Sequence, residues 1–173
     1  MPIRSVQAIS GVSAGVENVV MTVYPSIASS GIGQMLGRLY ESIPNKVMGV
    51  KLSNLLFTLP TIPFALMLYA QTKVTGYRYV LSNRRMTIQA ALTDRQFMDV
   101  ALPAIAEIEI EQLDGQQFYH AADLVLLDAG GGVLGRLGAV PRAEIFRQTI
   151  LEARDALTQT EAALATIAAR QTA

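Results

Sequence analysis

The uncharged stretch between Lys51 and Lys73 restricts the fold of this chain more than any other part of it. Residues 52–72 form 21 positions without a charge, and their apolar centre covers the 16 residues 55–70. A helix rises about 1.5 Å per residue and a bilayer core is about 30 Å thick, so this centre is barely long enough to cross. We therefore interpret it as a membrane segment of marginal length.

Two prolines interrupt this segment near its middle. Pro60 and Pro63 each remove a backbone donor and bend a helix, so the segment is either a kinked span or a hairpin that enters the lipid and returns. The lysines at both ends leave its orientation open. A third interpretation is a buried helix in the core of a soluble domain. The predicted membrane residues are Leu55, Phe57, Pro60, Pro63, Phe64 and Leu68.

Composition and charge favour contact with a membrane. Hydrophobic residues make up 51% of the chain and charged residues 16%, against about 25% charged in an average soluble domain. Residues 1–95 hold nine cations and three acids, whereas residues 96–173 hold five cations and eleven acids, giving +6 and −6. The cationic half suits an anionic cytoplasmic leaflet, with the acidic half held away from it. We therefore expect the cell inner membrane as the location, with the barrel predicted below facing the cytoplasm. The cations form no stripe interleaved with aromatic residues, so the sequence does not predict nucleic-acid binding.

Two elements are predicted before the apolar segment. Residues 17–24 alternate with a period of two and predict a strand. Residues 27–43 carry apolar side chains at spacings of three and four, typical of an amphipathic helix that can lie in a membrane interface. Ser29, Gly33 and Gly37 recur every four residues, which either lets two helices approach closely or merely weakens a surface helix.

Short alternating runs follow the apolar segment. They predict six strands at the spacing of a small sandwich or barrel, over residues 77–81, 86–90, 95–102, 105–112, 118–127 and 133–137. Pro141 then begins a helix whose first half can plug an open barrel end. Its alanine-rich second half either pairs with another protein or a second copy, or is a solvated tail.

These elements divide the chain into four segments. Residues 1–26 form an N-terminal segment with one strand, and residues 27–72 hold the amphipathic helix and the membrane segment. Residues 73–157 form the barrel and its capping helix, and residues 158–173 form the helical tail.

Four blocks resemble the bacterial pleckstrin-homology (PH) family, a group of membrane-associated proteins. They are ENVVMTVYPS at 17–26, YVLSNRRM at 79–86, LPAIAEIEIE at 102–111 and AVPRAEIFRQTILEA at 139–153. The resemblance implies an α+β, mainly β fold: a PH-like seven-stranded barrel or sandwich capped by a C-terminal helix. Residues 17–24 would supply the seventh strand, which favours the hairpin over a single crossing. The family has no general ligand that carries over.

No catalytic chemistry is predicted. The run GGGVLG at 130–135 matches a dinucleotide motif, but a strand follows it where that motif needs a helix. His120 is the only histidine and the chain has no cysteine, so a typical zinc site has too few ligands. Glu107, Glu109 and Glu111 alternate as expected on a solvent face. We expect no enzyme activity, no cofactor and no metal.

One basic patch is a candidate lipid-binding site. Arg84 and Arg85 lie at a predicted hairpin tip, with Arg78 and Lys73 nearby in sequence. Each cation near an anionic surface contributes about 1 kcal/mol, although turn chemistry and solubility explain the same residues. We expect a membrane-associated adaptor or assembly module. The alternatives are an anionic-lipid-binding module that uses the hairpin tip, and a soluble domain with the apolar segment in its core.

Overall fold

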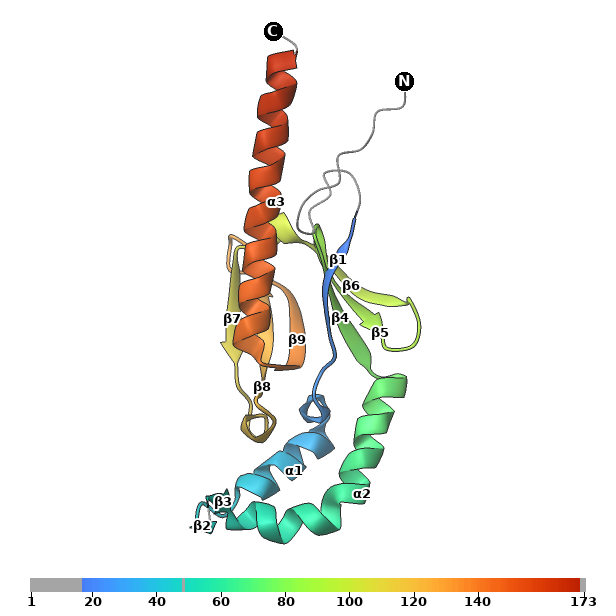
Figure 1. Ribbon diagram of the computed structural model, residues 1–173, viewed down its shortest axis with the longest axis vertical. Coiled ribbons are helices and arrows are strands. Elements are labelled where there is room, and N and C mark those ends of the chain that lie inside the picture. Colours follow the sequence, from blue (N-terminus) through green and yellow to red (C-terminus); the bar gives the residue numbers. More distant parts are fainter. Residues whose placement is uncertain (1–16, 48, 172–173) are drawn as a thin grey trace.

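The protein has two parts in its computed structural model, which describes residues 17–47 and 49–171. The body consists of two β-sheets and the helix α3 (Ala143–Gln171). The helical unit consists of α1 (Gly31–Glu41) and α2 (Leu52–Thr75). Figure 1 shows the helical unit at one end of the body and the second half of α3 projecting from the other end.

Four antiparallel strands form the first sheet, in the order β1-β4-β5-β6. Their bounds are Val19–Val23 for β1, Tyr77–Ser82 for β4, Arg85–Ala90 for β5 and Gln96–Ala101 for β6. β1 pairs with β4, with Val23 opposite Tyr79. The predicted seventh strand is thus confirmed, and both ends of the helical unit attach to the same sheet.

Three antiparallel strands form the second sheet, in the order β7-β8-β9. Their bounds are Glu107–Glu111 for β7, Ala121–Leu127 for β8 and Val133–Pro141 for β9. The short 3-10 helices are η1 (Ile27–Ser29), η2 (Leu102–Ala104) and η3 (Gln117–Tyr119). All six strands predicted after the apolar segment are therefore present, with shifted ends.

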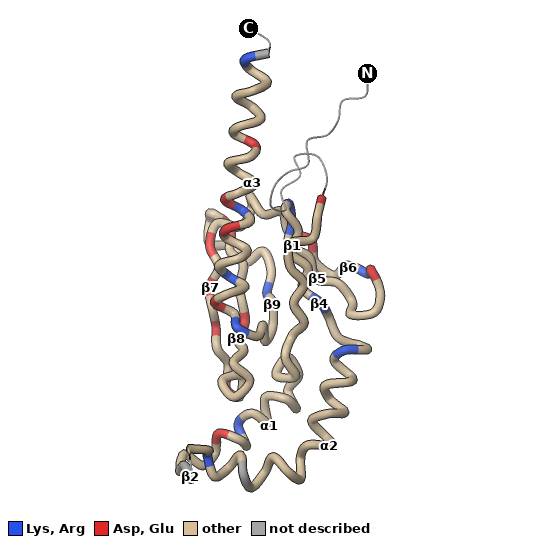
Figure 2. Tube along the Cα trace, viewed as in Figure 1, with Lys and Arg blue, Asp and Glu red and all other residues tan. Residues whose placement is uncertain are grey.

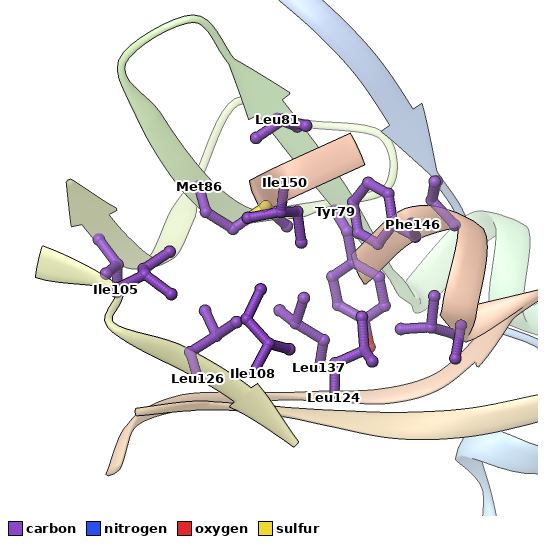
Figure 3. Packing of buried hydrophobic residues seen from close by; sticks show 14 of the residues in the cluster. Tyr79, Leu81, Met86, Ile105, Ile108, Leu124, Leu126, Leu137, Phe146 and Ile150 are labelled. Carbon is purple, nitrogen blue, oxygen red and sulfur yellow. The ribbon is translucent and has the colours of Figure 1, made fainter. Parts of the chain in front are cut away.

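Both sheets and α3 contribute to one hydrophobic core, which is drawn in Figure 3. Phe146, Ile150 and Leu157 lie on the buried face of α3, as the spacing of three and four residues predicts. Full burial of one such side chain stabilises a fold by roughly 1.5–3 kcal/mol. The first half of the C-terminal helix therefore packs into the core as its stripe predicts, but the closed barrel that it was expected to cap is not found among the described strands.

The two sheets do not close into the expected barrel. Within the described chain they share no strand ladder, although the backbone N–H of Ser26 donates to Ala139 O at 2.9 Å. The hydroxyl of Tyr79 also crosses this seam and donates to Gly138 O at 2.8 Å. The architecture is a two-sheet α+β sandwich.

The predicted amphipathic helix is α1. It begins at Ser30, whose hydroxyl accepts a hydrogen bond from the N–H of Gly33 at 3.1 Å, a typical N-cap. A short antiparallel ribbon connects α1 to α2, and its two strands, β2 (Lys46–Val47) and β3 (Val50–Lys51), have two residues each.

The small residues of α1 contact the rest of the chain rather than a second helix. A Cβ added at Gly37 would lie 2.0 Å from the carbonyl oxygen of Gly115, and one added at Gly115 would lie 2.1 Å from Gln34 O. Gly115 also has a φ of +84°, which disfavours other residues. Gly37 therefore lets α1 contact the turn after β7, and Gly33 lies against the carbonyl oxygen of Ile27 in η1, so these two glycines do more than weaken a surface helix.

The apolar segment is one helix. α2 has 24 residues and continues through Pro60 and Pro63, and Figure 1 shows it curving beneath α1. The chain does not reverse within the segment, so the expected hairpin is wrong at this position, and α1 and α2 together make the turn. In the described part of the chain, no helix is both long and apolar enough to cross a bilayer, so the expected kinked span is not found.

Candidate membrane-binding surface

α2 carries an uncharged apolar surface, which we call the outer face of α2. Its large exposed side chains are Leu56, Leu59, Ile62, Phe64, Leu66, Met67 and Tyr69. Leu59 is 78% exposed. Figure 2 shows that charged residues lie only near the ends of α2. Exposed apolar residues that gather in one patch, rather than singly, are typical of an interaction site.

The opposite side of α2 packs onto α1. Leu68 is buried beside Leu36 and Tyr40 of α1. The hydroxyls of Tyr40 and Thr61 are hydrogen-bonded at 2.5 Å, and the hydroxyl of Ser53 donates to the carbonyl oxygen of Tyr40. These contacts fix α2 on α1 and leave the outer face without a partner among the described residues.

The six predicted membrane residues do not share one surface. Phe57 and Leu68 face α1, whereas Phe64 belongs to the outer face. Pro60 and Pro63 are exposed as well. The side chain of Leu55 lies outside the described part of the structure. A helix in the core of a soluble domain would have its apolar side chains buried, whereas those on the outer face of α2 are exposed.

A lysine lies at each end of α2. Lys51 is 3.9 Å from Glu41 of α1, a long ion pair. The ammonium of Lys73 lies 3.8 Å from the ring centroid of Tyr24 and 5.5 Å from that of Tyr69. A cation over an aromatic face is attracted by the ring, and a lysine stem can cover apolar surface while its charge stays in water. Both lysines can therefore lie at the boundary between an apolar phase and water, with the stem in the apolar phase and the charge in water.

The four predicted lipid-binding cations lie in two different places. Arg84 and Arg85 lie at the turn between β4 and β5, whereas Lys73 is on α2 and Arg78 is near the start of β4. Figure 1 shows β4 running away from α2, so the hairpin tip lies at the end of the body opposite the helical unit. The structure therefore does not bring these cations into one patch.

Two of these arginines already have carboxylate partners. Arg85 lies 2.9 Å from Glu17 and 2.8 Å from Asp99, and the hydrogen bond to Asp99 is the main reason why the pKa of Arg85 is raised. Arg78 lies 2.6 Å from Asp94. Arg84 is exposed and pairs with no carboxylate of the described residues. Lipid binding at the hairpin tip stays a prediction.

The residues weighed for metal and nucleotide chemistry lie in ordinary structural roles. Asp128 Oδ1 accepts hydrogen bonds from the N–H groups of Gly130 and Gly132 at 2.8 and 2.7 Å, which forms the turn before β9. His120 is exposed with a left-handed φ of 49° before β8, not within a strand as expected. In the ranges that the structure describes, no three His, Cys, Asp or Glu side chains group to hold a metal.

Asp123 on β8 is a structural carboxylate that the sequence analysis did not single out. It is buried, and its Oδ1 accepts from Gln116 Nε2 at 2.6 Å and from the N–H of Ala139 at 2.8 Å. The second bond holds Ala139 at a φ of 47°. One signal was available, because Asp123 is the only charge in the run AADLVLL.

The outer-face residues Leu56, Leu59 and Met67 were also missed as individual candidates. Helical periodicity puts Phe64 on the same side as Phe57, seven residues earlier, so it does not show which side chains of residues 52–75 stay exposed. No protein-family model matches the chain, and no curated protein matches it either.

Proposed function

We propose that this protein is a non-enzymatic, membrane-associated PH-like adaptor that lies on a bilayer through the outer face of α2. The observation that carries the proposal is that outer face: uncharged, apolar and exposed on a helix fixed at one end of the body. An interfacial helix buries such a face at the boundary between head groups and acyl chains without spanning. The proposed location is the cytoplasmic side of the cell inner membrane.

The PH-like assignment is supported by strand count and order. Sheets of four and three antiparallel strands are followed by a helix that enters their common core. The most specific block of the resemblance, YVLSNRRM, falls on the β4–β5 hairpin. An adaptor needs a second surface for its partner, and the exposed second half of α3 is our candidate for contact with another protein or a second copy.

Flotation with lipid vesicles tests the membrane proposal. We expect the full-length protein to float with vesicles of phosphatidylglycerol and phosphatidylethanolamine, and the variant Leu56→Glu, Leu59→Glu to stay in solution. Full burial of each leucine contributes about 1.5–3 kcal/mol, and a glutamate adds repulsion from anionic lipid. Both side chains are exposed, so the urea midpoint of the variant should remain that of the wild type.

The matched control is Leu92→Glu, Val133→Glu. Leu92 and Val133 are exposed at 69% and 65%, but they lie on the body, in the turn after β5 and at the start of β9. This variant should float like the wild type. Equal flotation of the α2 variant and this control would overturn the proposal, and so would a wild-type chain that never floats.

The same assay distinguishes binding through the outer face of α2 from binding through the arginines of the hairpin tip. If Arg84 and Arg85 hold the protein on anionic lipid, then Arg84→Glu, Arg85→Glu abolishes flotation while Leu56→Glu, Leu59→Glu preserves it. Our proposal predicts the opposite ranking, because the tip lies at the far end of the body from α2.

A further inference from the structure

An apolar groove lies between α2 and the segment that follows β1. Its volume is about 500 Å³, within the range of roughly 300–1,000 Å³ that is typical of small-molecule sites. The segment of residues 24–27 forms one wall and α2 the other, and Tyr119 and Pro141 of the body complete the lining. The α2 residues in the groove are Ile62, Ala65, Leu66, Tyr69 and Lys73.

Two polar groups of this groove have no carboxylate or hydrogen-bond partner in the described chain. The ammonium of Lys73 lies against the ring of Tyr24, and none of the lining residues is acidic. The hydroxyl oxygen of Tyr119 is buried without a hydrogen-bond partner. Burial raises the pKa of Tyr119 to about 12. This hydroxyl oxygen is itself buried, so the ammonium of Lys73 is the polar group that the groove offers to a ligand.

The groove is continuous with the outer face of α2. Ile62, Leu66 and Tyr69 line the groove and are also more than 40% exposed on that face. A molecule in the groove therefore contacts the same side chains that we propose to lie in the bilayer. An apolar channel with one unpaired cation is complementary to an apolar chain that ends in an anionic group.

We propose that the groove holds one acyl chain of an anionic lipid drawn from the bilayer, with its negative group at Lys73. This inference rests on the proposed function, because the lipid enters from the membrane on which α2 lies. The protein would then bind a bilayer in two ways, through the outer face by partition and through the groove by a single bound chain.

A soluble probe tests the groove without vesicles. Dansyl-undecanoate has an apolar chain and a carboxylate, and we expect saturable fluorescence enhancement with one site per full-length chain. Lys73→Gln should weaken binding about tenfold, as expected for loss of one charged hydrogen bond. Lys51→Gln is the matched control, because it removes the cation at the other end of α2, outside the groove lining, and it should leave the affinity unchanged.

A second variant fills the groove. Ala65→Phe places a ring in the lining and should reduce probe affinity by at least tenfold, and its urea midpoint reports whether the contact of α2 with α1 survives. If that variant fails to fold, the affinity of Lys73→Gln for the probe is the test of the groove proposal. Probe affinity that is unchanged in Lys73→Gln, or no probe binding by the wild type, overturns the groove proposal.

The two proposals fail separately. Leu56→Glu, Leu59→Glu lies outside the groove, so it should lose vesicle flotation and keep probe binding. Ala65→Phe should keep flotation and lose the probe. Flotation without probe binding leaves the membrane proposal standing and overturns the groove. Probe binding without flotation by the wild type overturns both the membrane proposal and the bilayer as the source of the bound chain.

Discussion

The two long helices of this protein use their apolar residues in opposite ways. α3 carries a stripe at spacings of three and four, and Phe146 and Ile150 of that stripe are buried in the core of the body. α2 is apolar around its circumference, and only its inner side, with Leu68, packs against α1. The stripe of α3 is therefore explained by the fold.

The outer face of α2 has no such explanation within the chain. Leu59 and Leu66 are among the most exposed large apolar residues of the described structure. Single exposed apolar residues are ordinary, but a whole face of them is not. The comparison indicates that the first half of the α3 stripe serves stability, whereas the α2 face is free for the interaction that we propose.

The largest expected effect comes from the same residue type in the two helices. Phe146 is 1% exposed and Phe64 is 42% exposed. Phe146→Ala should lower the free energy of unfolding by about 3–5 kcal/mol, because it leaves a cavity in the core, and Phe64→Ala by about 0.5 kcal/mol. Urea unfolding of both variants measures this. Equal losses would mean that the two helices are not different in the way we describe.

The next largest effect concerns Asp123 in the body. Asp123→Ala removes an acceptor from buried Gln116 and from the backbone of Ala139, which then keeps a left-handed φ without support. We expect a loss of about 3 kcal/mol in urea unfolding, typical of breaking a buried charged network. Thr61→Val, which removes a hydroxyl from the contact of α2 with α1, should cost about 1 kcal/mol. If Thr61→Val lost more free energy of unfolding than Asp123→Ala, the helical unit would contribute more to stability than the Asp123 network of the body.

Alkaline pH should weaken the folded state through two tyrosines. Burial raises the pKa of Tyr79 well above its ordinary value and that of Tyr119 to about 12. In the unfolded chain both tyrosines lose their protons near pH 10, whereas in the folded chain both keep them. The free energy of unfolding is therefore unaffected by these groups below about pH 10 and falls as pH rises above it.

Urea midpoints at pH 9 and pH 11 measure this loss. Tyr119→Phe should reduce the drop between the two pH values, since one of the two groups no longer titrates. A drop that Tyr119→Phe leaves unchanged would contradict the role of this group.

The smallest effect should follow removal of residues 158–173. Residues 161–170 are all exposed, and Leu157 is the last buried position of α3. Truncation after Leu157 should change the free energy of unfolding by less than about 0.5 kcal/mol. Sedimentation of the same pair of proteins tests the predicted contact with a second copy: a wild-type dimer that the truncation converts to a monomer supports it. A large loss of stability in a monomer would assign this half of α3 to the fold.

Local patterns predicted most of the fold. The alternation of Tyr79 and Leu81 located β4, and the turn after it located β5. The ends of strands were less accurate, because tertiary contacts decide them. The strand predicted from residue 118 begins at Ala121, since η3 and the left-handed His120 precede it, and β9 extends to Pro141 because it pairs there with Ala121.

What the sequence did not predict depends on contacts between distant segments. Strands can be counted from their alternation, but closure of a barrel depends on pairing between the two sheets, and the described strands of one sheet form no ladder with those of the other. The apolar segment was found, yet its single bent helix and its exposed side follow from the fit of Leu68 and Tyr40. The cations of the predicted patch are adjacent in sequence, but a strand separates Lys73 and Arg78 from the hairpin tip.

The contact of Gly37 with Gly115 has a consequence for how the molecule would sit on lipid. Two backbones meet there directly, so no side chain can rearrange to let α1 roll or slide against the second sheet. This contact restricts movement of α1 against the turn after β7, and so it restricts how the sheets can tilt relative to the helical unit. If the outer face of α2 lies on a bilayer as we propose, the free end of α3 points away from the lipid, where a binding partner can reach it.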